Sequence, residues 1–131
     1  MTADDVWHRA LDAPALGTAG LLEGDLALVS VLLVHGSVMN GGVLNAVEDS
    51  FTDQELDAVE NGFRWFGLET AARVFADTRA AVAPGTLTLA EREALELEAD
   101  RQYESVVPDD EFLVDVFEAR FAADPAAFAA V

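Results

Sequence analysis

The sequence predicts an all-helical fold, and three observations lead to that prediction. Helix-capping patterns recur along the chain, apolar residues repeat at intervals of three and four, and no segment shows the alternation typical of a strand. Alanine, the strongest helix former, is the commonest residue. Apolar residues make up 52% of the 131 residues, which is enough for a core, and domains typically have roughly 100–200 residues. We therefore expect an all-α fold in which residues 1–131 form one compact single-domain bundle of about seven or eight short helices.

Three Thr-x-x-acid patterns predict the first turns of helices. In such a capping box the hydroxyl and the acid each accept a hydrogen bond from a backbone amide that the helix leaves free. The pairs are Thr2 with Asp5, Thr52 with Glu55, and Thr88 with Glu91. Asp109 and Asp124 also stand at expected helix starts, and Pro125 fits the first helical position. Together with the apolar spacing, these signals predict helices over residues 3–12, 21–38, 42–49, 53–66, 68–82, 89–106 and 110–123, and a short one after Pro125.

The apolar spacing also predicts which side of each helix enters the core. Leu56, Val59, Phe63 and Phe66 lie three or four residues apart, and so share one side of a helix. The same spacing recurs in the two later helices. The residues expected to be mostly buried are Leu28, Leu32, Leu56, Val59, Phe63, Phe66, Phe75, Leu95, Tyr103, Leu113, Phe117 and Phe121.

One stretch is long enough to raise the question of a membrane span. No charged residue falls between Asp25 and Glu48, and a transmembrane helix needs about 20 apolar residues. The most apolar part, however, runs only from Leu26 to Val34, and polar residues and glycines follow it. We therefore expect a buried core helix that ends in a glycine turn, and no membrane partner. The N-terminal residues lack the basic and apolar regions of a signal peptide, so a cytoplasmic location is expected.

The net charge of −18, from 25 acids and seven arginines, limits the partners of this chain. Nucleic-acid binding depends on Lys and Arg side chains that neutralise phosphates, and the sequence has no lysine. We therefore expect no direct contact with nucleic acid, and a basic protein, such as a DNA-binding regulator, as the partner. The plain alternative is that the acidity reflects only solubility or adaptation to salt.

The acids gather in two segments. Residues 48–60 hold six acids and no base, whereas residues 91–118 hold eleven acids and only two arginines. Acids three or four residues apart on a helix form a row, which roughly resembles the phosphates along a nucleic-acid strand. We expect both rows to be exposed, mostly without salt-bridge partners, and to meet on one face or across a homodimer. The candidate partner-binding residues are Glu48, Asp49, Asp53, Asp57, Glu60, Glu93, Glu96, Asp100 and Glu104.

No recognisable catalytic or metal-binding pattern occurs in the sequence. It has no cysteine, and it lacks the spacings of a phosphate-binding loop, a zinc protease and a calcium-binding loop. His35 follows the apolar stretch, and no nucleophile is placed to need it as a base. His35 is therefore expected to be a hydrogen-bonded core histidine, and we expect neither an enzyme nor a bound cofactor or metal.

The segment Asn40-Gly41-Gly42 is the most distinctive motif of the chain. Asn and Gly accept the positive φ found at the end of a helix, which predicts a corner between two helices. Because glycine also permits close approach to the backbone, this corner could instead hold a peptide or a small ligand. A binding domain of that kind is the second functional hypothesis.

Several motifs, taken in order, resemble a bacterial family of small acidic helical proteins that is classed as a domain of unknown function. They are Asn40-Gly41-Gly42, Gly67 between two helices, Tyr103 in an acidic helix, and Asp124-Pro125-Ala126-Ala127-Phe128. The chain departs from the family pattern at Ser37, Val43, Asn45 and Asp49, where the family has Glu, Phe, Gln and Asn. The family includes a DNA-mimic protein that occupies the DNA-binding surface of a transcriptional regulator. The resemblance therefore implies an all-helical fold and a role in binding.

Overall fold

The structure, a computed structural model of all 131 residues, contains six α-helices and no strands. The helices are α1 (Ala3–Leu16), α2 (Glu23–Asn45), α3 (Asp53–Trp65), α4 (Glu69–Val82), α5 (Leu89–Val106) and α6 (Asp110–Ala123). A π-helical turn, η1 (Ala46–Ser50), follows α2, and a 3-10 turn, η2 (Pro125–Ala127), follows α6. The all-helical class is confirmed, but the number of α-helices is six and not seven or eight.

The difference in number arises at the Asn-Gly-Gly motif. The sequence predicts that one helix ends at residue 38 and another begins at residue 42, whereas α2 continues to Asn45 with a kink at Gly42. Gly42 has a φ of +86°, which residues with a side chain rarely adopt. Helical bonding resumes at once, because the Ala46 amide donates to the carbonyl oxygens of Gly42 and Val43. The backbone of Gly42 is therefore not helical, and the Asn-Gly-Gly segment forms a corner between two helical stretches that together form α2.

The capping signals are confirmed. In all three boxes the threonine hydroxyl and the acid each accept a hydrogen bond from a backbone amide, at distances of 2.9–3.2 Å. The threonine amide holds the pKa of the paired carboxyl below its ordinary value in Asp5 and in Glu91. Asp109 caps α6 by accepting from the Phe112 amide at 2.8 Å. Asp124, by contrast, makes no side-chain capping bond at η2.

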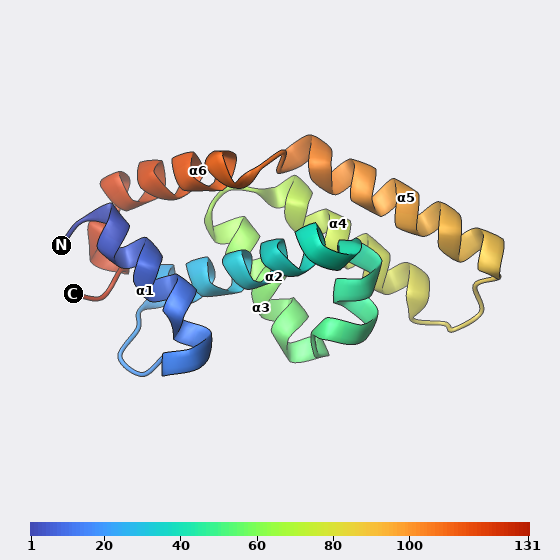
Figure 1. The fold of residues 1–131 in the computed structure, drawn as a ribbon, viewed down its shortest axis with the longest axis horizontal. Helices are drawn as coiled ribbons and strands as arrows, with labels where there is room; N and C mark the ends of the chain where they lie inside the picture. Colours follow the sequence, from blue (N-terminus) through green and yellow to red (C-terminus); the bar gives the residue numbers. More distant parts are fainter.

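Helix α2 runs through the middle of the molecule, and the other helices pack around it (Figure 1). It contacts α1, α3, α4 and α5. Helices α6 and α5 follow one another along one long edge, and the two chain ends lie close together at one end of the molecule (Figure 1). This arrangement separates the α5–α6 edge from α3, which carries the first of the two acidic rows.

The buried apolar side chains form two adjoining cores. The larger core lies among α2 to α5, where the rings of Phe63 and Phe75 stack at 5.7 Å and Tyr103 meets both edge-on. The smaller core lies among α1, α2 and α6, where Phe128 meets the Phe117 ring edge-on.

Most of the predicted core residues are buried, but four of the twelve are not. The prediction is wrong for Leu32, Phe66, Leu95 and Phe121, which are only half-buried. Leu32, Phe66 and Phe121 pack against the rims of the two cores. Leu95 lies in the first half of α5, while the buried residues of that helix, Ala99 and Tyr103, lie in the second half. Periodicity thus identified the correct side of each helix but not how far each core extends.

The segment Glu23–Ser50 is long and apolar enough to cross a membrane, by length and composition alone. In this structure the same segment supplies the central helix, and eleven residues of α2 are buried by the rest of the chain. They include the ionisable residues Asp25 and His35, each of which is bonded to a side chain from another part of the chain. The apolar character of α2 is therefore accounted for by the core that it forms, as the sequence predicts.

Candidate partner-binding surface

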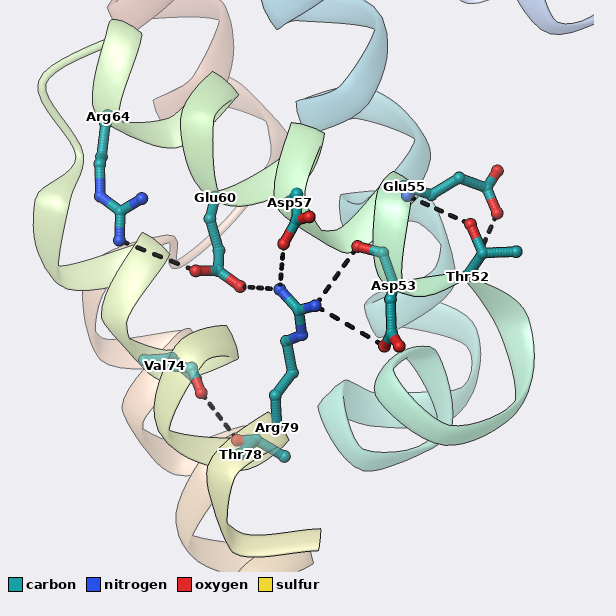
Figure 2. Close-up of polar contacts among 9 residues, drawn as sticks. All are labelled: Thr52, Asp53, Glu55, Asp57, Glu60, Arg64, Val74, Thr78 and Arg79. Atoms are coloured by element: carbon teal, nitrogen blue, oxygen red, sulfur yellow. Dashed lines mark hydrogen bonds and ion pairs between the residues drawn. The ribbon is translucent and has the colours of Figure 1, made fainter. Parts of the chain in front are cut away.

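The predicted acidic row on α3 is part of an ion-pair network with α4, shown in Figure 2. Arg79 of α4 donates to the carboxylates of Glu60 at 2.6 Å and Asp57 at 2.9 Å, and to the backbone carbonyl of Asp53 at 3.3 Å. Arg64 lies 3.7 Å from the other oxygen of Glu60. Glu60 is buried, with 8% of its surface exposed, while Asp53 and Asp57 are exposed. The expected exposure is therefore confirmed for Asp53 and Asp57 and wrong for Glu60, and the expected lack of salt-bridge partners is wrong for all three acids.

The spacing of the row explains why one arginine can bond to three acidic residues. Residues 53, 57 and 60 share one side of α3, and that side faces Arg79 (Figure 2). A guanidinium group has five N–H donors in a planar fork, so it can bond several carboxylates at once. These bonds raise the pKa of Arg79, with Glu60 contributing most and Asp57 next. The signal that sequence reasoning missed is this arginine, placed on the helix that follows the row.

The network predicts that Glu60→Gln destabilises the protein. A hydrogen bond between charged groups is lost from a buried position, so the free energy of unfolding should fall by about 2 kcal/mol. Urea unfolding would measure this loss. Asp77→Asn is the control, because Asp77 is an exposed acid of α4 without an ion pair, and surface changes of this kind stay within about 0.5 kcal/mol. A gain in stability from Glu60→Gln would mean that repulsion among the acids governs the row.

The two acidic segments meet at Arg92 of α5. Arg92 donates to both carboxylate oxygens of Glu48 in η1, one of them at 3.0 Å. These bonds lower the pKa of the Glu48 carboxyl. They also raise the pKa of Arg92, to which the nearby Asp49 and Glu96 add smaller contributions. The segments therefore converge at Glu48 and Asp49, whereas the α3 row faces α4.

Asp100 has a structural role at the kink of α2. Its carboxylate accepts a hydrogen bond from the Val43 amide at 2.9 Å. A Cβ on Gly42 would lie 3.0 Å from the same carboxylate, so both the positive φ and the lack of space favour glycine. Asn45 donates its side-chain amide to Ser50 at 3.3 Å. The corner proposed for a peptide or small ligand is thus occupied by groups of the chain itself.

The largest single group of exposed acids without an ion pair lies on α5 and α6, the two helices that follow one long edge of the molecule (Figure 1). These acids differ from the α3 row in that no arginine forms an ion pair with them, although Arg92 lies near Glu96. Those on α5 and α6 are Glu91, Glu93, Glu96, Glu104, Glu111, Asp115 and Glu118. The segment 91–118, with eleven acids and two arginines, carries a net charge of −9, which is half of the −18 of the whole chain. The structure therefore leaves the α5–α6 edge as the main surface of free carboxylates.

His35 links three helices, in agreement with the expected hydrogen-bonded core histidine. Its Nδ1 lies 2.7 Å from the Tyr103 hydroxyl of α5, and its Nε2 lies 2.6 Å from a carboxylate oxygen of Asp110 at the start of α6. Burial, and then the charge of Asp110, raise the pKa of Tyr103, so its side chain stays a neutral phenol. Because Tyr103 is buried, with 1% of its surface exposed, the chain of bonds fixes the position of α6 relative to α2.

The residues that carry the family resemblance have structural roles. Gly42 and Gly67 both have a positive φ, of +86° and +77°, while Tyr103 and Phe128 are buried in the two cores. In comparisons with known proteins, no family model, no curated protein and no solved structure matches this chain.

Proposed function

We propose that this protein is an acidic binding domain that engages a basic protein through the carboxylates of α5 and α6, and that it acts as a DNA mimic. The observation that carries the proposal is the contrast between the two acidic rows. Arg79 bonds the acids of the α3 row, whereas Glu93, Glu96 and Glu104 of α5 stay exposed and without an ion pair. The resemblance to a family that includes a DNA mimic favours the same role.

The charge density of α5 supports this proposal. Six acids lie between Glu91 and Glu104, which corresponds to about 20 Å of helix at about 1.5 Å per residue. One strand of DNA carries one charge per about 3.4 Å, close to the spacing of these six acids before Arg92 and Arg101 are counted. With Arg92 and Arg101 counted, the same stretch keeps a net charge of −4, so a protein surface adapted to DNA would meet a field of the same sign but weaker than that of a duplex, which carries one charge per about 1.7 Å. Such complementarity contributes mainly to fast association and to selectivity.

Neutral substitution of the α5 row should weaken binding and slightly stabilise the fold. In the triple variant Glu93→Gln, Glu96→Gln, Glu104→Gln, affinity for the partner should fall by at least about tenfold, since a row of like charges supplies the attraction. Stability should rise by a few tenths of a kcal/mol for each relieved repulsion. The partner would first be captured from an extract of the native host at low salt. Its affinity would then be measured across a salt series, in which binding should weaken as salt rises.

The matched control is Asp4→Asn, Asp12→Asn, Asp77→Asn, which changes the net charge equally at exposed acids on α1 and α4. If both triple variants weaken binding to the same extent, the interaction follows net charge and needs no row on α5. Duplex DNA of unrelated sequence should displace the captured partner from the wild-type protein. A partner that binds this protein and DNA at the same time would exclude mimicry.

A further inference from the structure

A groove of about 590 Å³ lies between α2 and α3, and none of its lining residues belongs to α5 or α6. Its lining includes the small residues Ala27, Ala58 and Gly62 and the larger side chains of Leu26 and Trp65. The two helices approach closely because α3 has a glycine at the contact. A Cβ on Gly62 would lie 2.9 Å from the carbonyl oxygen of Ala27. The close approach leaves a shallow channel with small residues between larger ones.

The groove continues along α2 into a second hollow, which shares Ser30 and Ala58 with the first. Leu26 lines the first hollow and Leu33 the second, and they are 44% and 40% exposed. Leu22, the N-cap residue directly before α2, is 45% exposed. From Leu22 to Leu33 the helix rises about 16 Å, or three turns. A contiguous apolar strip of this kind on a protein surface marks an interaction site.

The charges around the groove indicate what it binds. Glu23 lines the first hollow and Glu55 the second, and neither lining contains a basic residue, although the guanidinium of Arg120 lies 4.0 Å from the centre of the Trp65 ring. The channel has apolar walls and runs along about three turns of α2. A channel of this length can hold the apolar side of an α-helix, and binding of a helix in a groove is a recurrent mode of peptide recognition. We propose that the groove binds an amphipathic helix of a partner protein, whose apolar side contacts Leu26, Leu33 and Trp65 and whose flanking Lys or Arg residues meet Glu23 and Glu55.

Charge also separates this occupant from two others. A second copy of the chain would carry its own net charge of −18. Its glutamates would then lie close to Glu23 and Glu55 and repel them. Glu23 and Glu55 would likewise repel an anionic membrane surface, because anionic lipids attract basic segments and not acidic ones. The groove uses none of the carboxylates of α5 and α6, so this proposal is independent of the DNA-mimic surface.

Two synthetic peptides of about 15 residues test the proposal, long enough for the three turns. Both consist of Leu, Ala and Lys in the same proportions, but only one places its leucines on a single helical side. The readout is the fluorescence of Trp65, with calorimetry as a second measurement. The amphipathic peptide should bind at least about tenfold more tightly than the scrambled one, because only it can bury an apolar side in the groove.

Variants of the groove locate that binding. Leu26→Gln with Leu33→Gln should weaken binding of the amphipathic peptide by at least about tenfold, since apolar anchors dominate such contacts. Leu89→Gln with Leu97→Gln is the matched control, because both leucines are 74% exposed on α5, and it should leave binding unchanged. Ala58→Arg, which places a long cationic side chain in the groove, should abolish binding, and melting curves would show that each variant folds.

Several outcomes would overturn the proposal. Equal affinity for the two peptides, no binding of either, or a loss with Leu89→Gln and Leu97→Gln would show that the groove does not select an amphipathic helix. A wild-type dimer in sedimentation equilibrium that Leu26→Gln and Leu33→Gln dissociate would assign the groove to a second copy. The triple variant of the α5 row should bind the amphipathic peptide as the wild type does, so a failure here is distinguishable from a failure of DNA mimicry.

Discussion

Replacing Phe63 with alanine should lower the free energy of unfolding by about 3–5 kcal/mol, the range typical of a buried phenylalanine. Phe63 has no exposed surface, and its ring contacts those of Phe75 and Tyr103 at 5.7 and 6.3 Å. Truncation would remove both aromatic contacts and leave a cavity among α3, α4 and α5. Since small proteins have only about 5–15 kcal/mol of stability in total, one substitution should remove a large share of it.

Urea unfolding, followed by far-UV circular dichroism, measures this effect. Phe121→Ala is the matched control, because Phe121 is half-buried at the rim of the smaller core, and its loss should be clearly smaller. If the alanine variant of Phe63 does not fold, Phe63→Leu keeps most of the volume and should still cost about 1–2 kcal/mol. An equal loss from Phe63→Ala and Phe121→Ala would mean that the larger core is not centred on this ring.

The features that sequence predicted well depend on contacts within a few residues. In each capping box the two partners lie three residues apart, so the pattern Thr-x-x-acid contains the whole interaction. The apolar spacing of Leu56, Val59 and Phe63 similarly needs only the helical repeat. The corner at Gly42 was predicted because glycine accepts a positive φ, but the pattern did not show that helical bonding resumes directly beyond it, so that α2 extends to Asn45.

The features that sequence missed depend on partners that are distant in the chain. Nothing near Asp57 or Glu60 indicates that Arg79 lies against them, and because of this pairing neutralising Glu60 should destabilise the protein. Asp100 has the same helical spacing as Glu96 and Glu104, yet it bonds the Val43 amide 57 residues away. Equal spacing along a helix thus produced acids with different environments. The role of each acid follows from the helix packed beside it, which local pattern does not specify.

Replacing Asp25 with asparagine should destabilise the protein by about 3 kcal/mol, because removing one partner of a buried ion pair leaves the other charge without compensation. Asp25 is 1% exposed, and one of its oxygens accepts from Arg9 at 2.6 Å. The other oxygen accepts from the amides of Ala129 at 2.7 Å and Leu22 at 3.0 Å. Asparagine keeps the shape but places an N–H donor among donors, so it cannot satisfy all three.

This cluster of bonds also holds the C-terminal residues against α1 and α2. Arg9 donates to the carbonyl oxygens of Ala129 at 2.8 Å and Ala130 at 3.2 Å, next to the buried ring of Phe128. A Cβ on Gly24 would lie 2.8 Å from that ring, so the segment is closely packed as well as bonded. Asp25→Asn should therefore release the C-terminal residues before the rest of the fold, through loss of the bonds that join Asp25 and Arg9 to Ala129.

Two measurements check the Asp25 prediction. Urea unfolding gives the loss of stability, and hydrogen exchange of the Ala129 amide under native conditions reports the release of the C-terminal segment. Glu23→Gln is the matched control, because Glu23 is an exposed acid in the same first turn of α2 without an ion pair, and its effect should stay within about 0.5 kcal/mol. If Asp25→Asn unfolds at the same urea concentration as Glu23→Gln, the buried pair contributes nothing. If stability falls but the Ala129 amide remains protected, Asp25 acts on α1 and α2 alone, and other contacts, such as those of Phe128, hold the C-terminal segment in place.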